Sequence, residues 1–167
     1  MAHGIFRSDN MAGTVNGAYL ASAVYEPSST PTAIDNGNFV VLGAYKDGER
    51  EVQTATTPAA NTALAALAVV ASDEVDTTKE YTALGDYTNE AGKVLKCYKL
   101  HEQDIFSLST DAVAVGSGVT PAVGYVLEAQ AGTKGKVVAS LTSGSTKIAT
   151  LVAIETQGTT TWYVFRV

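Results

Sequence analysis

The stretch FVVLGAYKDGEREVQTAT, residues 39–56, gives the clearest indication of the fold. Its first part, Phe39–Tyr45, is rich in β-branched and aromatic residues, which favour strands, and residues 50–56 form a second segment of this kind. Between them, Asp47-Gly48 fits a two-residue type I′ turn, which needs positive φ at both central positions. The stretch therefore predicts a β-hairpin.

The last third of the chain continues the β pattern. Short apolar runs alternate there with turns rich in Gly and Ser, such as Thr142-Ser143-Gly144-Ser145. Five strands at short, even spacing are typical of an antiparallel sandwich or a small barrel, which residues from about 104 onward are expected to form on their own. The predicted strands are residues 105–109, 124–129, 136–141, 147–155 and 162–167.

Two further strands are predicted in the middle of the chain. Residues 67–71 have the pattern of a buried strand, and the Ala-rich residues 58–66 before them are open to a short helix as the alternative. In residues 93–100 the side chains would alternate between the two faces of a strand, and basic residues fall on both faces. This pattern predicts an exposed or edge strand.

The N-terminal segment has a different character. Residues 3–26 are small and polar, and glycines interrupt any period, which predicts an extended arm that finds its anchor on another molecule. We therefore expect an all-β protein with an extended N-terminal arm and linker at residues 1–32. The remainder divides into a hairpin-containing subregion, 33–103, and a C-terminal barrel or sandwich, 104–167, or else forms one compact domain, 33–167.

Composition and charge exclude several classes of function. Only 17% of the 167 residues are charged and the net charge is -6, with no run of Lys or Arg, so we expect no direct contact with nucleic acid. The one cysteine forms no internal disulfide, which fits synthesis in the cytosol. The N-terminus lacks the pattern of a secretory signal, and the most apolar tract, residues 63–71, is too short to span a bilayer, so no membrane contact is expected.

The residues that could carry out catalysis are few. His101 and Asp104 could form a weak metal or acid/base pair, but a solvated loop histidine is the better interpretation. Cys97 lies close to Lys96 and Lys99, which would lower the pKa of an exposed thiol, yet a cysteine in a strand is more often a small packing residue. We therefore predict no catalytic residues and a non-enzymatic protein.

Binding of metals and phosphates is also not expected. The acidic group Asp73-Glu74-Val75-Asp76 has the oxygen ligands of a calcium loop but lacks the glycine and the distal glutamate of an EF-hand. Gly116-Ser117-Gly118 is followed by neither a helix pattern nor a P-loop lysine, and it is therefore a turn. We predict no metal site and no cofactor.

The aromatic residues leave an alternative open. Exposed aromatics can form a groove for sugars or peptides, although sheet propensity and half-buried packing account for most tyrosines in a β protein. The candidates for such a groove are Tyr81, Tyr87, Tyr98, Trp162 and Tyr163.

Residues 84–93, LGDYTNEAGK, continue through residues 98–100 and 104–109 in a pattern that resembles small virion proteins of tailed bacteriophages. Within that group, the chain is similar to head decoration proteins, also called cement or auxiliary head proteins. The similarity includes residues 37–43 and the C-terminal strands, and so extends over most of the chain, without a single diagnostic motif.

The resemblance implies a structural protein on the outer face of an assembled capsid, at junctions between capsomers. Its partner would be the major capsid protein, and it would be located in the virion after synthesis in the host cytoplasm. Whether it also forms a homo-oligomer is left open. With the predicted arm as the docking element, the candidate capsid-binding residues are Ile5, Phe6, Arg7, Asn10, Tyr19 and Tyr25. A tail-tube or baseplate component and a carbohydrate-binding surface module are the alternatives.

Overall fold

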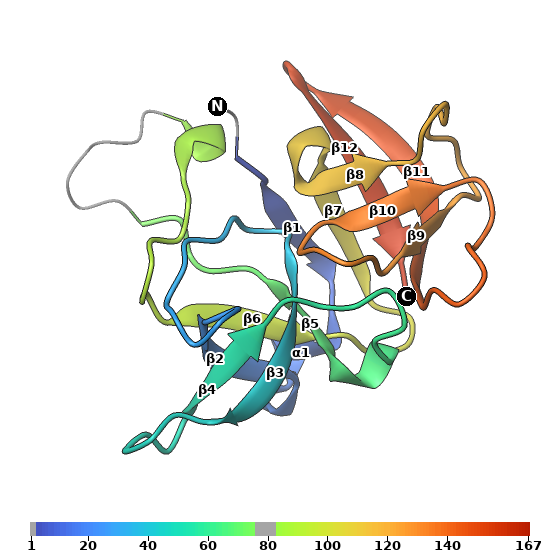
Figure 1. Ribbon diagram of the computed structural model, residues 1–167. Helices are drawn as coiled ribbons and strands as arrows, with labels where there is room; N and C mark the ends of the chain where they lie inside the picture. Colours follow the sequence, from blue (N-terminus) through green and yellow to red (C-terminus); the bar gives the residue numbers. More distant parts are fainter. Residues whose placement is uncertain (1–2, 76–82) are drawn as a thin grey trace.

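A computed structural model describes residues 3–75 and 83–167, and their strands form two sheets (Figure 1). The prediction of an all-β protein is confirmed. The strands are β1 (Phe6–Asn10), β2 (Leu20–Tyr25), β3 (Phe39–Tyr45), β4 (Val52–Thr56), β5 (Leu67–Val70), β6 (Leu95–Lys99), β7 (Ile105–Ser109), β8 (Val113–Val115), β9 (Val126–Glu128), β10 (Gly135–Val138), β11 (Lys147–Gln157) and β12 (Thr160–Arg166). The helices are short: α1 (Ala12–Val15), η1 (Gly17–Tyr19), η2 (Leu64–Ala66), η3 (Leu84–Asp86) and η4 (Thr110–Ala112).

Five strands close into a ring in the order β2-β4-β3-β5-β6. Strand β2 completes the ring, because it pairs in parallel with β4 on one side and antiparallel with β6 on the other. The other neighbours in the ring are antiparallel. Each of the five strands therefore has a partner along both edges.

Small side chains fill the interior of this ring. Side chains alternate along a strand, so one residue of each pair points inward and the next points outward. Ala23, Ala55, Ala68 and Cys97 lie at inward positions and are fully buried. A ring of five strands has a narrow interior, which accounts for the alanine-rich composition of these strands. The interior also holds Tyr25, Ile34, Val40, Val70 and Leu95.

The other sheet is open and has the strand order β1-β7-β12-β11-β9-β10-β8. Its neighbouring strands are antiparallel except for β10 and β8, which run parallel. Strands β1 and β8 are the two edges. The long β11–β12 hairpin lies at the centre, and Trp162 to Arg166 of β12 pair with β7.

The main hydrophobic core lies between the ring and the open sheet. Phe39 and Val69 project outward from the ring and join Phe106, Leu151 and Phe165 from the open sheet. Phe106 has ring-centroid distances of 6.4 Å to Phe39 and 5.8 Å to Phe165, with the Phe39 ring near edge-on. One continuous core therefore holds the two sheets together.

The predicted hairpin is confirmed, but the predicted turn type is wrong. Strands β3 and β4 pair antiparallel, with Leu42 opposite Ala55, and a register shift follows before Tyr45. Among the described residues, Gly48 has a φ of 82° whereas Asp47 is not at positive φ. The backbone N–H of Lys46 donates to the carbonyl of Val52, so the loop covers residues 46–51 and is longer than a type I′ turn.

The prediction of an extended N-terminal arm is wrong, because residues 3–25 belong to the folded body. Strand β1 pairs with β7, and β2 closes the ring. The glycines that indicated a flexible arm allow close packing instead. A Cβ at Gly4 would lie 2.6 Å from the carbonyl oxygen of Asn36, and one at Gly13 would lie 2.6 Å from the Tyr98 ring.

Two other expectations need correction. The closed barrel is built from residues 20–99, whereas residues 105–166 form an open sheet with β1, because β8 pairs only with β10. Strand β6 was expected at an edge from its lysines, but it lies between β2 and β5. Leu95 and Cys97 point into the ring, and Lys96 and Lys99 reach solvent at its surface.

The narrow ring predicts that an inward alanine does not tolerate enlargement. Replacing Ala55 with Leu should destabilise the protein by about 1–3 kcal/mol, because overpacking displaces neighbouring side chains. Ala44→Leu is the matched control, since Ala44 lies exposed on β3 of the same hairpin and should change stability by less than about 0.5 kcal/mol. Urea denaturation measures both, and equal stability of the two variants would contradict a narrow interior.

Candidate functional site

A polar cleft of about 310 Å³ separates strand β1 from the ring. Phe6 and Ser8 of β1 form one side, and the segment after β5 together with β6 forms the other. We call this the edge cleft. Its lining residues are Phe6, Ser8, Asn36, Ala71, Ser72, Asp73, Glu74, Lys96 and Tyr98.

The backbone of β1 presents a free edge to this cleft. Ile5, just before β1, is bonded to β7, since the Ser109 N–H donates to the Ile5 carbonyl at 3.0 Å. Backbone groups alternate in direction along an antiparallel strand, so those of Phe6, next to Ile5, point away from β7. Ser8 lies in a register shift between Arg7 and Asn10, and it has no registered partner on β7. Within the described residues β1 pairs only with β7. This edge can therefore accept another strand.

Buried asparagines fix the wall of the edge cleft. Asn36 and Ser72 are joined twice: the Asn36 amide donates to the Ser72 carbonyl at 2.9 Å, and the Ser72 N–H donates to Asn36 Oδ1 at 3.0 Å. The amide of Asn89 donates to Asn36 Oδ1 and to the Ile34 carbonyl, both at 3.0 Å. Three loops are thereby held together, and a satisfied buried network of this kind is rigid.

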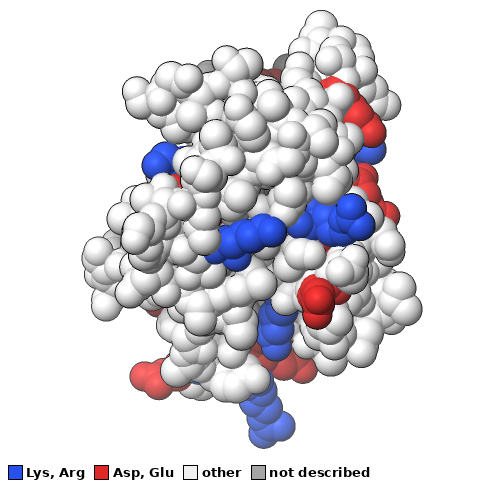
Figure 2. Space-filling model, turned by 90° about the vertical axis from the view of Figure 1, so that its right-hand side faces the viewer, with Lys and Arg blue, Asp and Glu red and all other residues white. Residues whose placement is uncertain are grey.

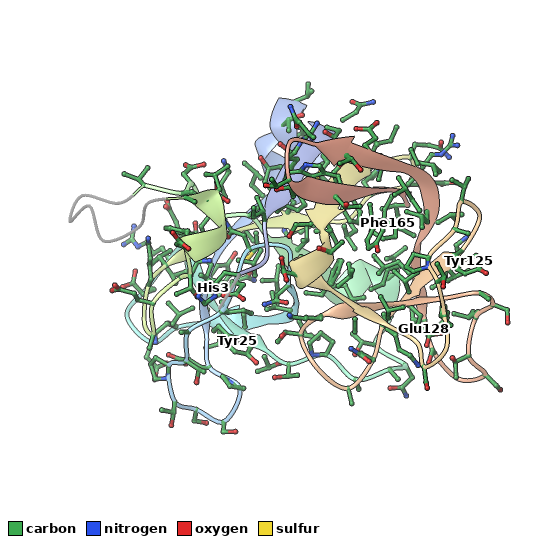
Figure 3. All side chains as sticks on the ribbon, turned by 90° about the horizontal axis from the view of Figure 1, so that it is seen from above. His3, Tyr25, Tyr125, Glu128 and Phe165 are labelled. Atoms are coloured by element: carbon green, nitrogen blue, oxygen red, sulfur yellow. The ribbon has the colours of Figure 1, made fainter. Side chains whose placement is uncertain are left out.

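A second polar contact anchors the start of the chain to the same loops. Nδ1 of His3 lies 2.7 Å from Oδ1 of Asp35, which also accepts a hydrogen bond from the Thr88 hydroxyl at 2.8 Å. Figure 3 shows His3 and Tyr25 on the side of the ring, and Glu128, Tyr125 and Phe165 on the side of the open sheet. The N-terminal residues are thus held against the loops beside the ring.

The charged groups of the edge cleft influence each other. Partial burial raises the pKa of Glu74, opposed by a hydrogen bond from Asn36, while the nearby Asp73 carboxylate raises it further. Burial acts to lower the pKa of Lys96, but Tyr98 and Asp73 outweigh it and raise the pKa. Lys96 Nζ lies 3.3 Å from Asp73 Oδ1, which makes this side of the cleft both acidic and basic.

The structure does not bring the predicted capsid-binding residues to one surface. Ile5 and Tyr25 are buried, and the Tyr25 hydroxyl lies 2.7 Å from Oγ1 of Thr57. Phe6 packs against Tyr98, with ring centroids 6.0 Å apart. These side chains have packing roles, although Phe6 also lines the edge cleft.

The other three predicted residues reach the surface at different places. The Arg7 guanidinium lies 4.9 Å from the centre of the Trp162 ring. Tyr19 packs edge-on against His101 at 4.9 Å. Asn10 is exposed at the end of β1.

Sequence reasoning missed the other residues of the edge cleft. The pattern Asp35-Asn36-Gly37-Asn38 predicts a turn, which residues 36–37 form, but a turn pattern does not reveal that Asn36 is only 2% exposed. Asp73 and Glu74 were considered as ligands of a calcium loop, and Ser8 was placed in the predicted arm.

The residues considered for catalysis make packing and backbone contacts within the fold. The Asp104 carboxylate accepts hydrogen bonds from the backbone N–H groups of Ala12, at 2.7 Å, and His101, at 2.9 Å, rather than from the imidazole of His101. Cys97 is buried inside the ring, and burial raises its pKa to about 12. Its thiol is therefore protonated in the folded protein at neutral pH.

The proposed aromatic groove does not form from the aromatic residues that the structure describes. Tyr87, Tyr98, Trp162 and Tyr163 are all less than 10% exposed. Tyr81 lies outside the described residues. A face of aromatic rings open to a sugar is therefore not present at these four positions.

Surveys of the described residues and of known proteins add no site. Among residues 3–75 and 83–167, no three His, Cys, Asp or Glu side chains are grouped as metal ligands. In the same residues no helix has the length and apolar character needed to cross a membrane. Comparisons with protein-family models, with curated proteins and with solved structures found no match to this chain.

The buried position of Cys97 predicts its reactivity. A thiol reagent at mildly alkaline pH should leave Cys97 unmodified in the native protein and should label it rapidly in denaturant, because the ring must open for the thiolate to form. Mass spectrometry after timed exposure measures the labelled fraction. Labelling of the native protein at the rate of the unfolded chain would show that the ring is not closed.

Proposed function

We propose that this chain is a non-enzymatic virion protein that binds the outside of an assembled phage capsid and stabilises it, with the free edge of β1 as the docking element. The observation that carries the proposal is the edge of β1 at Phe6 and Ser8, which lies beside the edge cleft and pairs with no described strand. The resemblance of residues 84–93 to head decoration proteins supplies the class of partner, the major capsid protein.

Edge pairing would supply a general affinity for extended segments. A peptide that adds as a strand to a sheet edge forms main-chain hydrogen bonds, and neighbouring pockets select its side chains. The edge cleft offers both, because Asp73, Glu74 and Lys96 lie across from the backbone of β1. An extended segment of the shell protein is therefore the occupant that we propose.

Because the N-terminal residues are already folded, docking through β1 would cost little conformational entropy. A disordered arm loses conformational freedom when it binds, whereas β1 is already held by β7 and by the Ile5–Ser109 contacts. Because such a protein binds the assembled shell in preference to free subunits, its binding free energy stabilises the assembled state by mass action.

The low charge density of the surface is consistent with such a role. On the face shown in Figure 2, basic and acidic side chains occur in small groups among residues without charge. Contacts with a protein lattice need complementary shape and few unpaired charges.

Point changes at the free edge test the proposal, because removing residues 2–25 would also remove a strand of the ring. Ser8→Pro deletes the backbone N–H of a residue that has no registered partner on β7, and proline is tolerated at sheet edges and bulges, so the fold should survive. Binding to empty capsids of the virus that encodes the chain should fall at least about tenfold, measured by co-sedimentation.

Ser8→Ala is the matched control, since it keeps the N–H and should bind like the wild type. Circular dichroism and thermal unfolding check that both variants fold. Equal capsid binding by the Pro and Ala variants would exclude edge pairing, and a wild-type chain that does not sediment with capsids would overturn the proposed function.

A further inference from the structure

A second cleft, of about 460 Å³, lies at one end of the ring. At this end β2 and β4 begin while β3 and β6 end, so residues from four strands and the β3–β4 loop meet there. We call it the barrel-end cleft. Ligand sites in small barrels commonly lie at such an end, where the interior core stops.

The charge of the barrel-end cleft is opposite to that of the chain. Arg50, Lys96 and Lys99 line it with a single acidic residue, Glu51. The whole chain has 11 basic and 17 acidic residues and a net charge of -6. The cleft is thus a local concentration of positive charge on an acidic protein.

Two of these cations have no counter-charge among the described residues. Lys96 is engaged by Asp73 at 3.3 Å. In the part of the chain that the structure describes, neither Arg50 nor Lys99 lies within 4.0 Å of a carboxylate. Lys99 is partly exposed and reaches solvent at the surface of the ring. Both groups can therefore pair with carboxylates from outside.

The remaining lining suits a peptide better than a mineral ion. Tyr45 is 59% exposed and presents an aromatic face, and Leu20 adds an apolar contact. Gly17, Ala21 and Ser22 are small and leave room for a chain to lie across β2. Nucleic acid fits less well, because a long polyanion would be repelled by the rest of this acidic chain.

We propose that the barrel-end cleft binds a short acidic peptide segment of a partner protein, with Arg50 and Lys99 pairing with its carboxylates and Tyr45 packing on an adjacent apolar side chain. This is a second docking site, separate from the free edge of β1. It does not depend on the capsid proposal, because any partner with an exposed acidic segment satisfies it.

A labelled acidic peptide tests the proposal with the purified full-length protein. The probe is an octapeptide of alternating Glu and Leu, compared with the same peptide carrying Gln for Glu. Fluorescence anisotropy should show binding of the Glu peptide that weakens as salt is raised, and at least about tenfold weaker binding of the Gln peptide.

The double variant Arg50→Gln/Lys99→Gln should lose at least about tenfold in affinity for the Glu peptide, because it removes two charge-assisted contacts. Lys147→Gln/Arg166→Gln is the matched control, since it removes the same two residue types from exposed positions on the open sheet. It should retain wild-type affinity within about twofold.

Several results would overturn the proposal. They are equal losses in the two double variants, equal binding of the Glu and Gln peptides, tighter binding of single-stranded DNA than of the Glu peptide, and no measurable binding at low salt. The assay contains no capsids, so such a result leaves the edge-pairing test unaffected. Likewise, a failure of Ser8→Pro to weaken capsid binding leaves the acidic-peptide proposal unaffected.

Discussion

The closure of the ring by β2 is the constraint on which the rest of the structure depends. Strand β2 supplies the parallel partner of β4 and the antiparallel partner of β6, and no other described strand pairs with both. A closed ring of five strands leaves little interior space, which requires small inward residues such as Ala23 and Ala55. Phe39 and Val69 point outward, and they form the surface against which the open sheet packs.

This arrangement explains why β1 is an edge. Once β2 is committed to the ring, the short segment of α1 and η1 before it leads back to β1, which joins the opposite sheet through β7. The chain therefore crosses from one sheet to the other within its first 20 residues. The edge cleft lies at this crossing, between β1 and the loops fixed by Asn36 and Asn89. Rigid walls on both sides distinguish it from a gap between mobile loops.

The sequence predicted strands well where neighbours along the chain pair with each other. The limits of β7 were predicted to the residue, and the β3–β4 and β11–β12 regions were recognised as strands, because local pattern and turn chemistry determine them. The prediction for the N-terminal segment was wrong because the strands with which it pairs are distant in the sequence. Phe6 pairs with Leu108 and Ser22 with Lys96, and neither partner influences the local composition. Likewise, the burial of Asn36 depends on Ser72 and Asn89, which a local turn pattern cannot reveal.

The length of the free edge limits what can dock there. A register shift between Arg7 and Asn10 interrupts the pairing with β7, and Arg7 and Asp9 place charges on the strand. Bulges and charges of this kind protect natural sheet edges from uncontrolled pairing. The open part of the edge is therefore confined to the region of Phe6 and Ser8, enough for a few main-chain hydrogen bonds. Specificity must come from side chains. Lys96 lines both clefts, so both of the proposed docking sites would share this residue.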